Sequence, residues 1–225
     1  NKDLPKIQFK NIDHIVFAGV GGSGTVGDVI SSILSKKNIH TNVVKGYLLP
    51  KTVDSNTLIV TTSVSGNSKE ILTVLQNAKK SKGKLLAFSS GGNMKKYSVK
   101  NKISYYQIPE IHSPRASFSG YVYSILNVLE DVIPVKKRDV KESIDQLVKT
   151  KKKISSNNLT NSNPALSLAK WISHFPIIYY PSGLHSAAIR FKNSLQENAK
   201  MHVFAEDIIE SSHNGIVAWE KRSKI

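Results

Sequence analysis

The feature that most constrains how this chain folds is a repeated order of apolar strand, small-residue turn and amphipathic helix. A strand is predicted at 14–18 (HIVFA), and it runs into GVGGSG and then into apolar residues at helical spacing. The same order recurs at 57–62 (TLIVTT), which runs into SVSGNS and a second helical pattern. Strands that alternate with helices predict an α/β fold, with a mainly parallel sheet flanked by helices on both sides and ligands at the carboxyl ends of its strands.

The rest of this first region continues the alternation. Further strands are predicted at 41–44, 85–88 and 103–108, and a further helix at 118–129. The short basic segment that follows SSGGN (89–93) receives no assignment.

A change of composition divides the chain. Lys, Asp, Ser and Asn dominate between Asp131 and Asn163, which predicts a helix followed by a polar loop. We place a domain boundary near Pro134, so that residues 1–133 form a first domain and residues 134–225 begin a second. The second contains a predicted helix at 164–173, a strand at 177–180 and a helix from Gly183 to about Lys200. Because it is too short for a whole sheet, we expect it to lack its C-terminal portion.

The charge of the chain raises the question of a nucleic-acid partner. There are 32 basic and 16 acidic residues among 225, a formal charge of +16. Only four of the basic residues are Arg, however, the side chain whose planar fork reads base edges. A solvated Lys-rich surface is therefore favoured, nucleic acid is not expected, and a polyanion partner stays as the alternative.

Other compositional features narrow the chemistry and the location. The chain has no cysteine, which excludes disulfides, thiolate metal sites and a cysteine nucleophile. No apolar run approaches the roughly 20 residues of a transmembrane helix, and the first ten residues do not resemble a signal peptide. We therefore expect a cytoplasmic protein that does not enter the membrane.

The first turn, Gly19–Gly24, has the pattern GxGxxG between a strand and a helix. A dinucleotide-binding turn occupies that position, but the acidic residue expected after the second strand is absent, and Lys45 there would suit the 2′-phosphate of NADP instead. A tight turn without a ligand is a further interpretation. The turn's free N–H groups and the Ser23 hydroxyl favour a phosphate or a sugar oxygen.

The second turn, Ser63–Ser68, places three hydroxyls at a helix N-terminus. Asn67 or Ser68 could cap the helix, with Glu70 completing a capping box. Capping needs one such side chain and leaves Ser63 and Ser65 unexplained. Several hydroxyls beside free N–H groups form a cradle for a phosphate dianion, so the two turns together predict one phosphorylated small molecule.

Five segments resemble, in order and character, motifs of the archaeal type of bifunctional phosphoglucose/phosphomannose isomerase, an SIS-domain family. They are GVGGSGTVGD, SVSGNSKE, HSPRASFSGY, SLQENAK and ESSHNGIVAWE, and they span residues 19–220. The resemblance implies two SIS domains, each a flavodoxin-like three-layer sandwich, with the second truncated here. It also implies interconversion of glucose 6-phosphate, and mannose 6-phosphate, with fructose 6-phosphate through a cis-enediol, without metal or organic cofactor.

The resemblance further implies roles for individual residues. Those expected to contact the sugar are Gly21, Gly22 and Ser23, those expected to bind phosphate are Ser63, Ser65 and Ser68, and those expected beside the reacting carbons are Pro114 and Arg115. Glu197 matches the family's base and His213 its ring-opening residue, contributed across the interface of a homodimer. No residue spacing in the chain indicates a metal site.

Three of these residues also suit isomerisation by their chemistry. A single carboxylate such as Glu197 can carry a proton between neighbouring carbons, although a surface Glu paired with Lys200 is the alternative. Arg115 stays charged and presents planar donors to a developing oxyanion, and His213 can move a proton near neutral pH.

The sequence departs from the family's pattern at three places. Ser68 stands where Thr is usual, and Gly215 replaces a Glu after His213-Asn214, which we expect to loosen the loop that aims His213. A further catalytic Lys and a Thr of the family belong to a segment beyond Ile225. A non-catalytic SIS module that senses a sugar phosphate for a regulator is the competing hypothesis, and no helix-turn-helix precedes Gly19 to support it.

Overall fold

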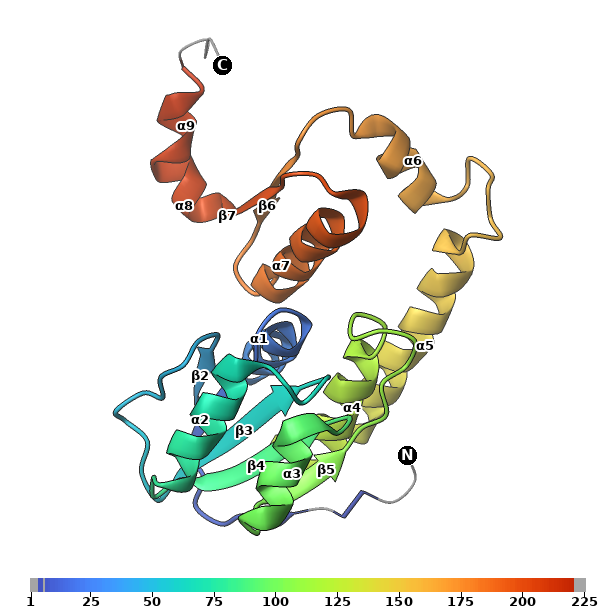
Figure 1. Cartoon of the computed structure of the whole chain (residues 1–225). Coiled ribbons are helices and arrows are strands. Elements are labelled where there is room, and N and C mark those ends of the chain that lie inside the picture. Colours follow the sequence, from blue (N-terminus) through green and yellow to red (C-terminus); the bar gives the residue numbers. More distant parts are fainter. Residues whose placement is uncertain (1–3, 6, 221–225) are drawn as a thin grey trace. The chain divides into compact units, whose positions relative to one another are not determined.

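The computed structural model describes residues 4–5 and 7–220, and the chain divides into two compact units (Figure 1). Unit 1 consists of Asn1–Pro134 together with His185–Arg190, and unit 2 consists of Val135–Leu184 and Phe191–Ile225. In the described part of the chain, no helix is both long enough and apolar enough to cross a membrane.

Unit 1 is built on a five-stranded sheet in which every pair of neighbouring strands is parallel. Its strands are β1 (His14–Ala18), β2 (His40–Val44), β3 (Thr57–Ser63), β4 (Lys84–Ser89) and β5 (Ser104–Gln107). They are ordered β2-β1-β3-β4-β5, as in flavodoxin, so the direction of winding reverses between β1 and β3. The predicted strands and their parallel arrangement are confirmed.

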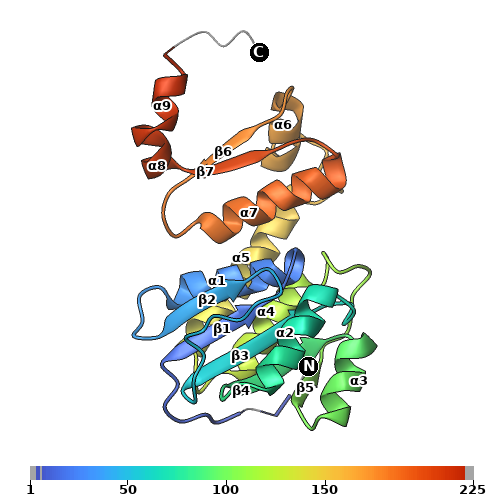
Figure 2. The ribbon, with the colours of Figure 1, turned by 60° about the vertical axis from the view of Figure 1, so that its left-hand side comes forward.

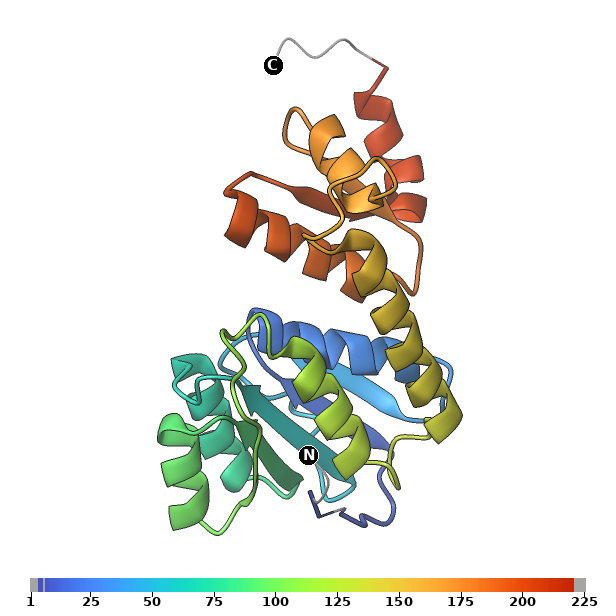
Figure 3. The same ribbon diagram turned by 90° about the vertical axis from the view of Figure 1, so that its right-hand side faces the viewer.

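Four helices cover the sheet: α1 (Gly22–Leu34), α2 (Lys69–Lys79), α3 (Gly92–Lys100) and α4 (Phe118–Val128). Helices α1 and α4 contact each other on one face, and α2 and α3 lie on the other (Figures 1 and 3). A parallel sheet covered on both faces requires strands that are apolar throughout rather than alternating. β1 and β3 meet this requirement, since every residue in them is buried.

The hydrophobic core of unit 1 forms where the apolar faces of the helices pack against alternate residues of the strands. Val16 and Ala18 pack on the α2 side of β1, with Ala78 and Val74 of that helix in the same clusters. On the other face Tyr121 of α4 is fully buried and donates its hydroxyl to the Ile108 carbonyl at 3.2 Å. Burial raises the pKa of Tyr121, so the phenol stays neutral and keeps this hydrogen bond.

Unit 2 contains a parallel pair of short strands and several helices. Its strands are β6 (Ile177–Tyr180) and β7 (Phe204–Asp207), which lie side by side in Figure 2. Its helices are α5 (Lys137–Ile154), α6 (Pro164–Trp171), α8 (Ile208–His213) and α9 (Gly215–Ala218). Helix α7 (His185–Ser194) begins in unit 1 and continues into unit 2 as a π-helical turn, η1 (Leu195–Ala199).

Local capping sets two of the helix starts in unit 2. The Asn163 side chain accepts the N–H groups of Ala165 and Leu166, and proline follows it at the first helical position of α6. Asp207 accepts the N–H of Ile209 at 2.9 Å in the same way at α8.

The structure adds elements that the sequence patterns did not predict. The basic segment after SSGGN is helix α3, whose buried residues are Met94 and Ser98, so it carries little apolar periodicity. β7, α8 and α9 also had no assignment, and each is short. The helix predicted from Gly183 to Lys200 is α-helical only for 185–194, and the chain then widens into the π turn before Lys200 adopts a left-handed φ of 57°.

Candidate functional site

The loops that follow β1 and β3 lie next to each other, where the winding of the sheet reverses. In a doubly wound sheet this switch point opens a crevice at the carboxyl ends of the strands, where ligands bind. The buried Ser23 hydroxyl of the first loop accepts the N–H of Val64 in the second at 3.3 Å. The two loops that the sequence predicted to bind anions are therefore in direct contact.

The glycine turn is shaped by a close approach of its backbone and by one positive φ. Gly21 has a φ of 56°, a conformation that L side chains rarely adopt. A Cβ on Gly24 would lie 2.7 Å from the Gly19 carbonyl oxygen, so the turn could not close as tightly with a larger residue. Helix α1 then begins at Gly22 with no side-chain cap on its first N–H groups. These groups keep their capacity to bind an anion.

Lys45, which would suit the 2′-phosphate of a dinucleotide, pairs with a carboxylate of the protein instead. The Lys45 ammonium forms an ion pair of 2.7 Å with the carboxylate of Asp28, which is 7% exposed. A lysine held by a buried carboxylate is not available to a 2′-phosphate. The NADP interpretation thereby loses the residue on which it rested.

The serine loop does not cap its own helix. The hydroxyl of Ser68, the N-cap residue of α2, makes no capping bond and instead lies 3.1 Å from the Ser63 hydroxyl. Asn67 turns to another helix, since its Oδ1 accepts the N–H of Asn93 in the first turn of α3 at 3.0 Å. The capping-box interpretation of this loop is wrong, and its hydroxyls stay beside the uncapped start of α2.

A third loop, Ser90–Gly91 between β4 and α3, holds the serine loop in place from the other side. The Ser90 N–H donates to the Val64 carbonyl at 2.9 Å, and the Met94 N–H donates to the Gly66 carbonyl at 2.9 Å. Gly66 has a φ of 69°, and a Cβ there would overlap the Gly91 carbonyl oxygen. The sequence reasoning assigned no function to this loop or to Asn67, although both shape the cradle.

A tyrosine behind the third loop contributes to its rigidity. The Tyr105 hydroxyl donates to the Ser89 carbonyl at 3.1 Å and lies 3.0 Å from the Ser89 hydroxyl. Burial raises the pKa of Tyr105, which keeps the phenol protonated at neutral pH.

The electrostatics of the switch point favour a negatively charged group without a fixed cation. The N-termini of α1 and α2 each carry roughly half a positive charge from the helix dipole, and both start at this edge of the sheet. The hydroxyls of Ser23, Ser63, Ser65 and Ser68 add neutral donors. Such an arrangement can hold a phosphate dianion by several hydrogen bonds at once.

The loop that carries Pro114 and Arg115 joins β5 to α4 and so opens at the same edge of the sheet. The buried Ser117 hydroxyl fastens it by accepting the Ile111 N–H at 2.8 Å and donating to the Ser113 carbonyl at 3.0 Å. Both Pro114 and Arg115 are exposed.

Arg190, which the sequence reasoning did not single out as a site residue, braces that loop within unit 1. Its Nη2 donates to the Arg115 carbonyl at 3.0 Å, and its guanidinium lies 4.8 Å from the centroid of the Phe118 ring. Its Nη1 also lies 3.5 Å from where a Cβ of Gly22 would stand. One guanidinium thus borders both the glycine turn and the Arg115 loop.

The family of the chain follows from comparison with known proteins. The SIS domain matches residues 8–128, which is more than half of the chain. The chain belongs to the SIS-domain family. In addition, the C-terminal SIS domain of bacterial phospho-glucose isomerases matches residues 161–225.

Several curated relatives within the SIS family are named bifunctional phosphoglucose/phosphomannose isomerase. That of Caldicellulosiruptor bescii is 32% identical over 97% of this chain and 66% of its own length. A D-glucosamine-6-phosphate 4-epimerase of Sulfolobus acidocaldarius is 27% identical over 96% of this chain and 66% of its own length. The chain spans 60 to 66% of the length of three of the curated isomerases it matches.

Solved structures agree on the fold. The glucosamine-6-phosphate deaminase of Thermotoga maritima superposes with a TM-score of 0.66 at 17% identity, covering 92% of this chain and 65% of that one. At that identity the likeness shows the SIS fold alone.

The two remaining predicted catalytic residues belong to unit 2. Glu197 lies in the π-helical turn, and its main-chain carbonyl accepts the Lys200 ammonium at 2.7 Å. His213 is the exposed last residue of α8. Because these residues and the SIS loops of unit 1 belong to separate units, their convergence on one substrate stays a prediction.

The segment after His213 is closely packed at Gly215. A Cβ on Gly215 would lie 2.6 Å from the Ser211 hydroxyl, and the neighbouring Asn214 amide donates to the Glu210 carboxylate at 2.7 Å. Glycine at this position therefore lets the backbone approach Ser211 closely. That Gly215 loosens the loop that positions His213 stays a prediction.

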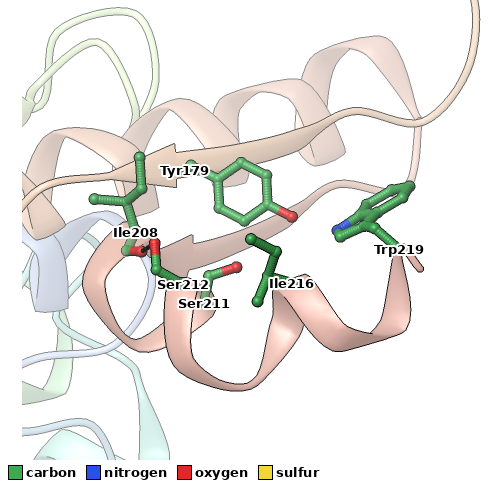
Figure 4. Close-up of a pocket in the computed structure, with 6 residues that line it drawn as sticks. All are labelled: Tyr179, Ile208, Ser211, Ser212, Ile216 and Trp219. Atoms are coloured by element: carbon green, nitrogen blue, oxygen red, sulfur yellow. Dashed lines mark hydrogen bonds between the residues drawn. The ribbon is translucent and has the colours of Figure 1, made fainter.

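Unit 2 also has an apolar hollow beside the same segment. This 240 Å³ pocket is lined by Tyr179, Ile208, Ser211, Ser212, Ile216 and Trp219, which Figure 4 shows. It has no charged lining, so it does not suit a phosphate. Among the described residues, no group of three or more histidine or acidic side chains is placed to hold a metal ion.

Proposed function

We propose that this chain forms part of an aldose–ketose isomerase that interconverts glucose 6-phosphate, and mannose 6-phosphate, with fructose 6-phosphate. The observation that carries the proposal is the contact between the glycine turn and the serine loop at the switch point, with both adjoining helices uncapped. The names of the curated relatives support the choice of reaction within the SIS family.

Substrate binding is assigned to unit 1. Ser63, Ser65 and Ser68 hold the phosphate, together with the first N–H groups of α2. The adjoining glycine turn, through Gly21, Gly22 and Ser23, contacts the sugar hydroxyls next to it. Because the donors are neutral, the phosphate is oriented by geometry, with little dependence on a counter-charge that salt would screen.

Proton transfer is assigned to Glu197. In the aldose-to-ketose direction its carboxylate takes the proton from C2 of the open-chain sugar, which leaves a cis-enediolate. It returns that proton to C1 while the proton of the O2 hydroxyl passes to O1, so no oxidant or reductant is needed. The π turn and the left-handed Lys200 support the assignment, since irregular helical turns concentrate at functional sites.

Two further residues complete the proposed reaction. The Arg115 guanidinium, next to Pro114, stabilises the negative charge that develops on the sugar oxygen as the proton leaves. His213 transfers the proton that opens the cyclic sugar, and it acts on the site of the partner subunit in a homodimer. No metal or organic cofactor takes part in this scheme.

The organisation of the whole protein belongs to the same proposal. Residues 1–133 form one SIS domain, and residues 134–225 form a linker helix and the N-terminal part of a second. An enzyme of hexose phosphate metabolism, acting in glycolysis and gluconeogenesis, is expected in the cytoplasm. A non-catalytic sensor of sugar phosphates is not favoured, because the curated relatives are named as enzymes.

The test is an activity assay of the full-length protein with glucose 6-phosphate and mannose 6-phosphate, in which fructose 6-phosphate is measured. Replacing Glu197 by Gln keeps its shape but removes the base, so kcat falls at least about 10³-fold while KM changes little. Glu142→Gln on exposed α5 is the matched control and retains wild-type rates. Wild-type turnover by Glu197→Gln would refute the assignment, and binding without turnover by the unaltered protein would favour the sensor.

A further inference from the structure

A pocket of unit 1 lies at the opposite edge of the sheet from the candidate substrate site. It has a volume of 350 Å³, and its lining includes Lys79 at the end of α2, Lys84 at the start of β4 and Lys102 before β5. The serine and glycine loops follow the carboxyl ends of the strands, whereas this pocket adjoins their amino ends. The six residues of β4 separate the two edges by roughly 20 Å.

The three lysines line one pocket from different elements, without carboxylate partners. No acidic residue lines the pocket, and among the described residues none of the three ammonium groups forms an ion pair. The Lys84 ammonium donates to the Lys10 carbonyl at 3.0 Å and lies 5.9 Å from the Phe9 ring centroid. Like charges brought into one hollow without counter-charges repel one another, and a bound anion would relieve that repulsion.

The negative ends of two helix dipoles compensate only part of the positive charge of the three lysines. α2 ends at Lys79 and α3 ends at Lys100, and lysines at helix C-termini are often present only to complement the negative ends of the dipoles. Two such termini contribute roughly −1 charge in total, against +3 from the lysines of the pocket. A net charge of roughly +2 is left, which matches a phosphate dianion.

The form of the pocket favours a small ligand over a chain-like polyanion. At 350 Å³ it is in the range of small-molecule sites, and its remaining lining includes the apolar side chains of Phe9, Leu85 and Ile103. Nucleic acid is usually bound along an extended groove, with many contacts to the backbone.

We propose that this pocket, which we name the lysine pocket, binds a small phosphorylated ligand at a site separate from the substrate site. Lys79, Lys84 and Lys102 hold the phosphate by charge-assisted hydrogen bonds, and the apolar wall contacts the rest of the ligand. The proposal does not depend on the isomerase assignment, because it uses none of the proposed catalytic or substrate-binding residues.

Calorimetric titration of the full-length protein with ADP and with pyrophosphate tests the proposal. We expect at least one probe to bind with a Kd below about 1 mM. The Lys84→Gln/Lys102→Gln double variant should raise that Kd at least about tenfold, since two charge-assisted contacts are lost. The control, Lys149→Gln/Lys152→Gln on exposed α5, removes the same charge and leaves the Kd within about twofold.

The outcomes separate the alternatives. Tighter binding of ADP than of pyrophosphate identifies a nucleotide as the ligand, and equal binding identifies the phosphate groups themselves. Saturating fructose 6-phosphate should leave the Kd unchanged, and the Lys84→Gln/Lys102→Gln variant should keep wild-type isomerase rates without a probe. Failure of both probes to bind at millimolar concentration, competition by fructose 6-phosphate, or equal weakening in the two double variants would each overturn the proposal. If the two double variants also weakened the binding of a 20-nucleotide single strand equally, the diffuse positive charge of the surface would account for the binding, and the lysine pocket would not.

Discussion

At the scale of single residues, the candidate site depends on positions where only one side chain fits. Gly66 combines a φ of 69° with a Cβ direction that points at the Gly91 carbonyl oxygen, so it is constrained both by its own backbone and by the neighbouring loop. Ser63 and Ser68 depend on this geometry, because the loop between them turns at Gly66. A distortion of the backbone at Gly66 would therefore displace the hydroxyls that form the phosphate cradle.

We therefore expect Gly66→Ala to lower the free energy of unfolding by about 2–4 kcal/mol and to raise KM for sugar phosphates. The loss combines a strained left-handed alanine with a steric overlap that only a backbone shift can relieve. Urea unfolding and steady-state kinetics measure the two effects.

The control for this substitution is Gly120→Ala in α4, where a Cβ has no atom within 4 Å. There, alanine should stabilise the helix by up to about 1 kcal/mol without changing KM. Similar effects of the two substitutions on stability would contradict the constraint assigned to Gly66.

The sequence indicated the serines of the cradle but not the residues that hold them. Ser23, Ser63 and Ser68 stand in a visible strand–turn–helix pattern, so local reasoning could find them. Asn67 acts on Asn93, 26 residues away, and Arg190 acts on Arg115, 75 residues away. Such partners are set by the tertiary fold, and one sequence does not reveal which of many polar residues will meet.

At the scale of elements, burial decided what could be predicted. β1 and β3 were predicted nearly to the residue because strands buried on both faces are continuous apolar runs. Helix α3 was missed because it is mostly exposed, and its start is determined by Gly91 and by Asn67 of the serine loop. The same contact couples α3 to the substrate loop.

We expect Asn67→Ala to cost about 1 kcal/mol of stability through the lost capping bond of α3, and also to raise KM several-fold because the serine loop loses an anchor. Asn163→Ala removes a comparable cap from α6 in unit 2 and is the matched control. It should cost a similar free energy of unfolding and leave KM unchanged. If both variants kept a wild-type KM, the proposed coupling between α3 and the serine loop would be wrong.

At the scale of the whole molecule, the proposed reaction requires residues from both units and from two subunits. The loops and Arg115 belong to unit 1, whereas Glu197 and His213 belong to unit 2. The family motifs in the sequence predicted that these residues act together, but no local pattern encodes how two units or two chains assemble. The arrangement is therefore best tested by mixing subunits.

Co-expression of a Glu197→Gln chain with a His213→Ala chain tests whether His213 acts across the dimer interface. Each homodimer lacks activity, but a mixed dimer has one site with an intact Glu197 and the partner's intact His213. With random pairing, half of the dimers are mixed and one of their two sites works, so activity should recover to about a quarter of wild type. Activity no higher than that of the inactive parents would place His213 in the site of its own chain.

The binding of the sugar phosphate between the loops of β1 and β3 is most directly tested by a crystal structure of the full-length protein with fructose 6-phosphate. We predict the phosphate within hydrogen-bonding distance of the hydroxyls of Ser63, Ser65 and Ser68, and the sugar against the glycine turn at Gly21–Ser23. A well-ordered sugar phosphate bound elsewhere, with this crevice empty, would contradict the account.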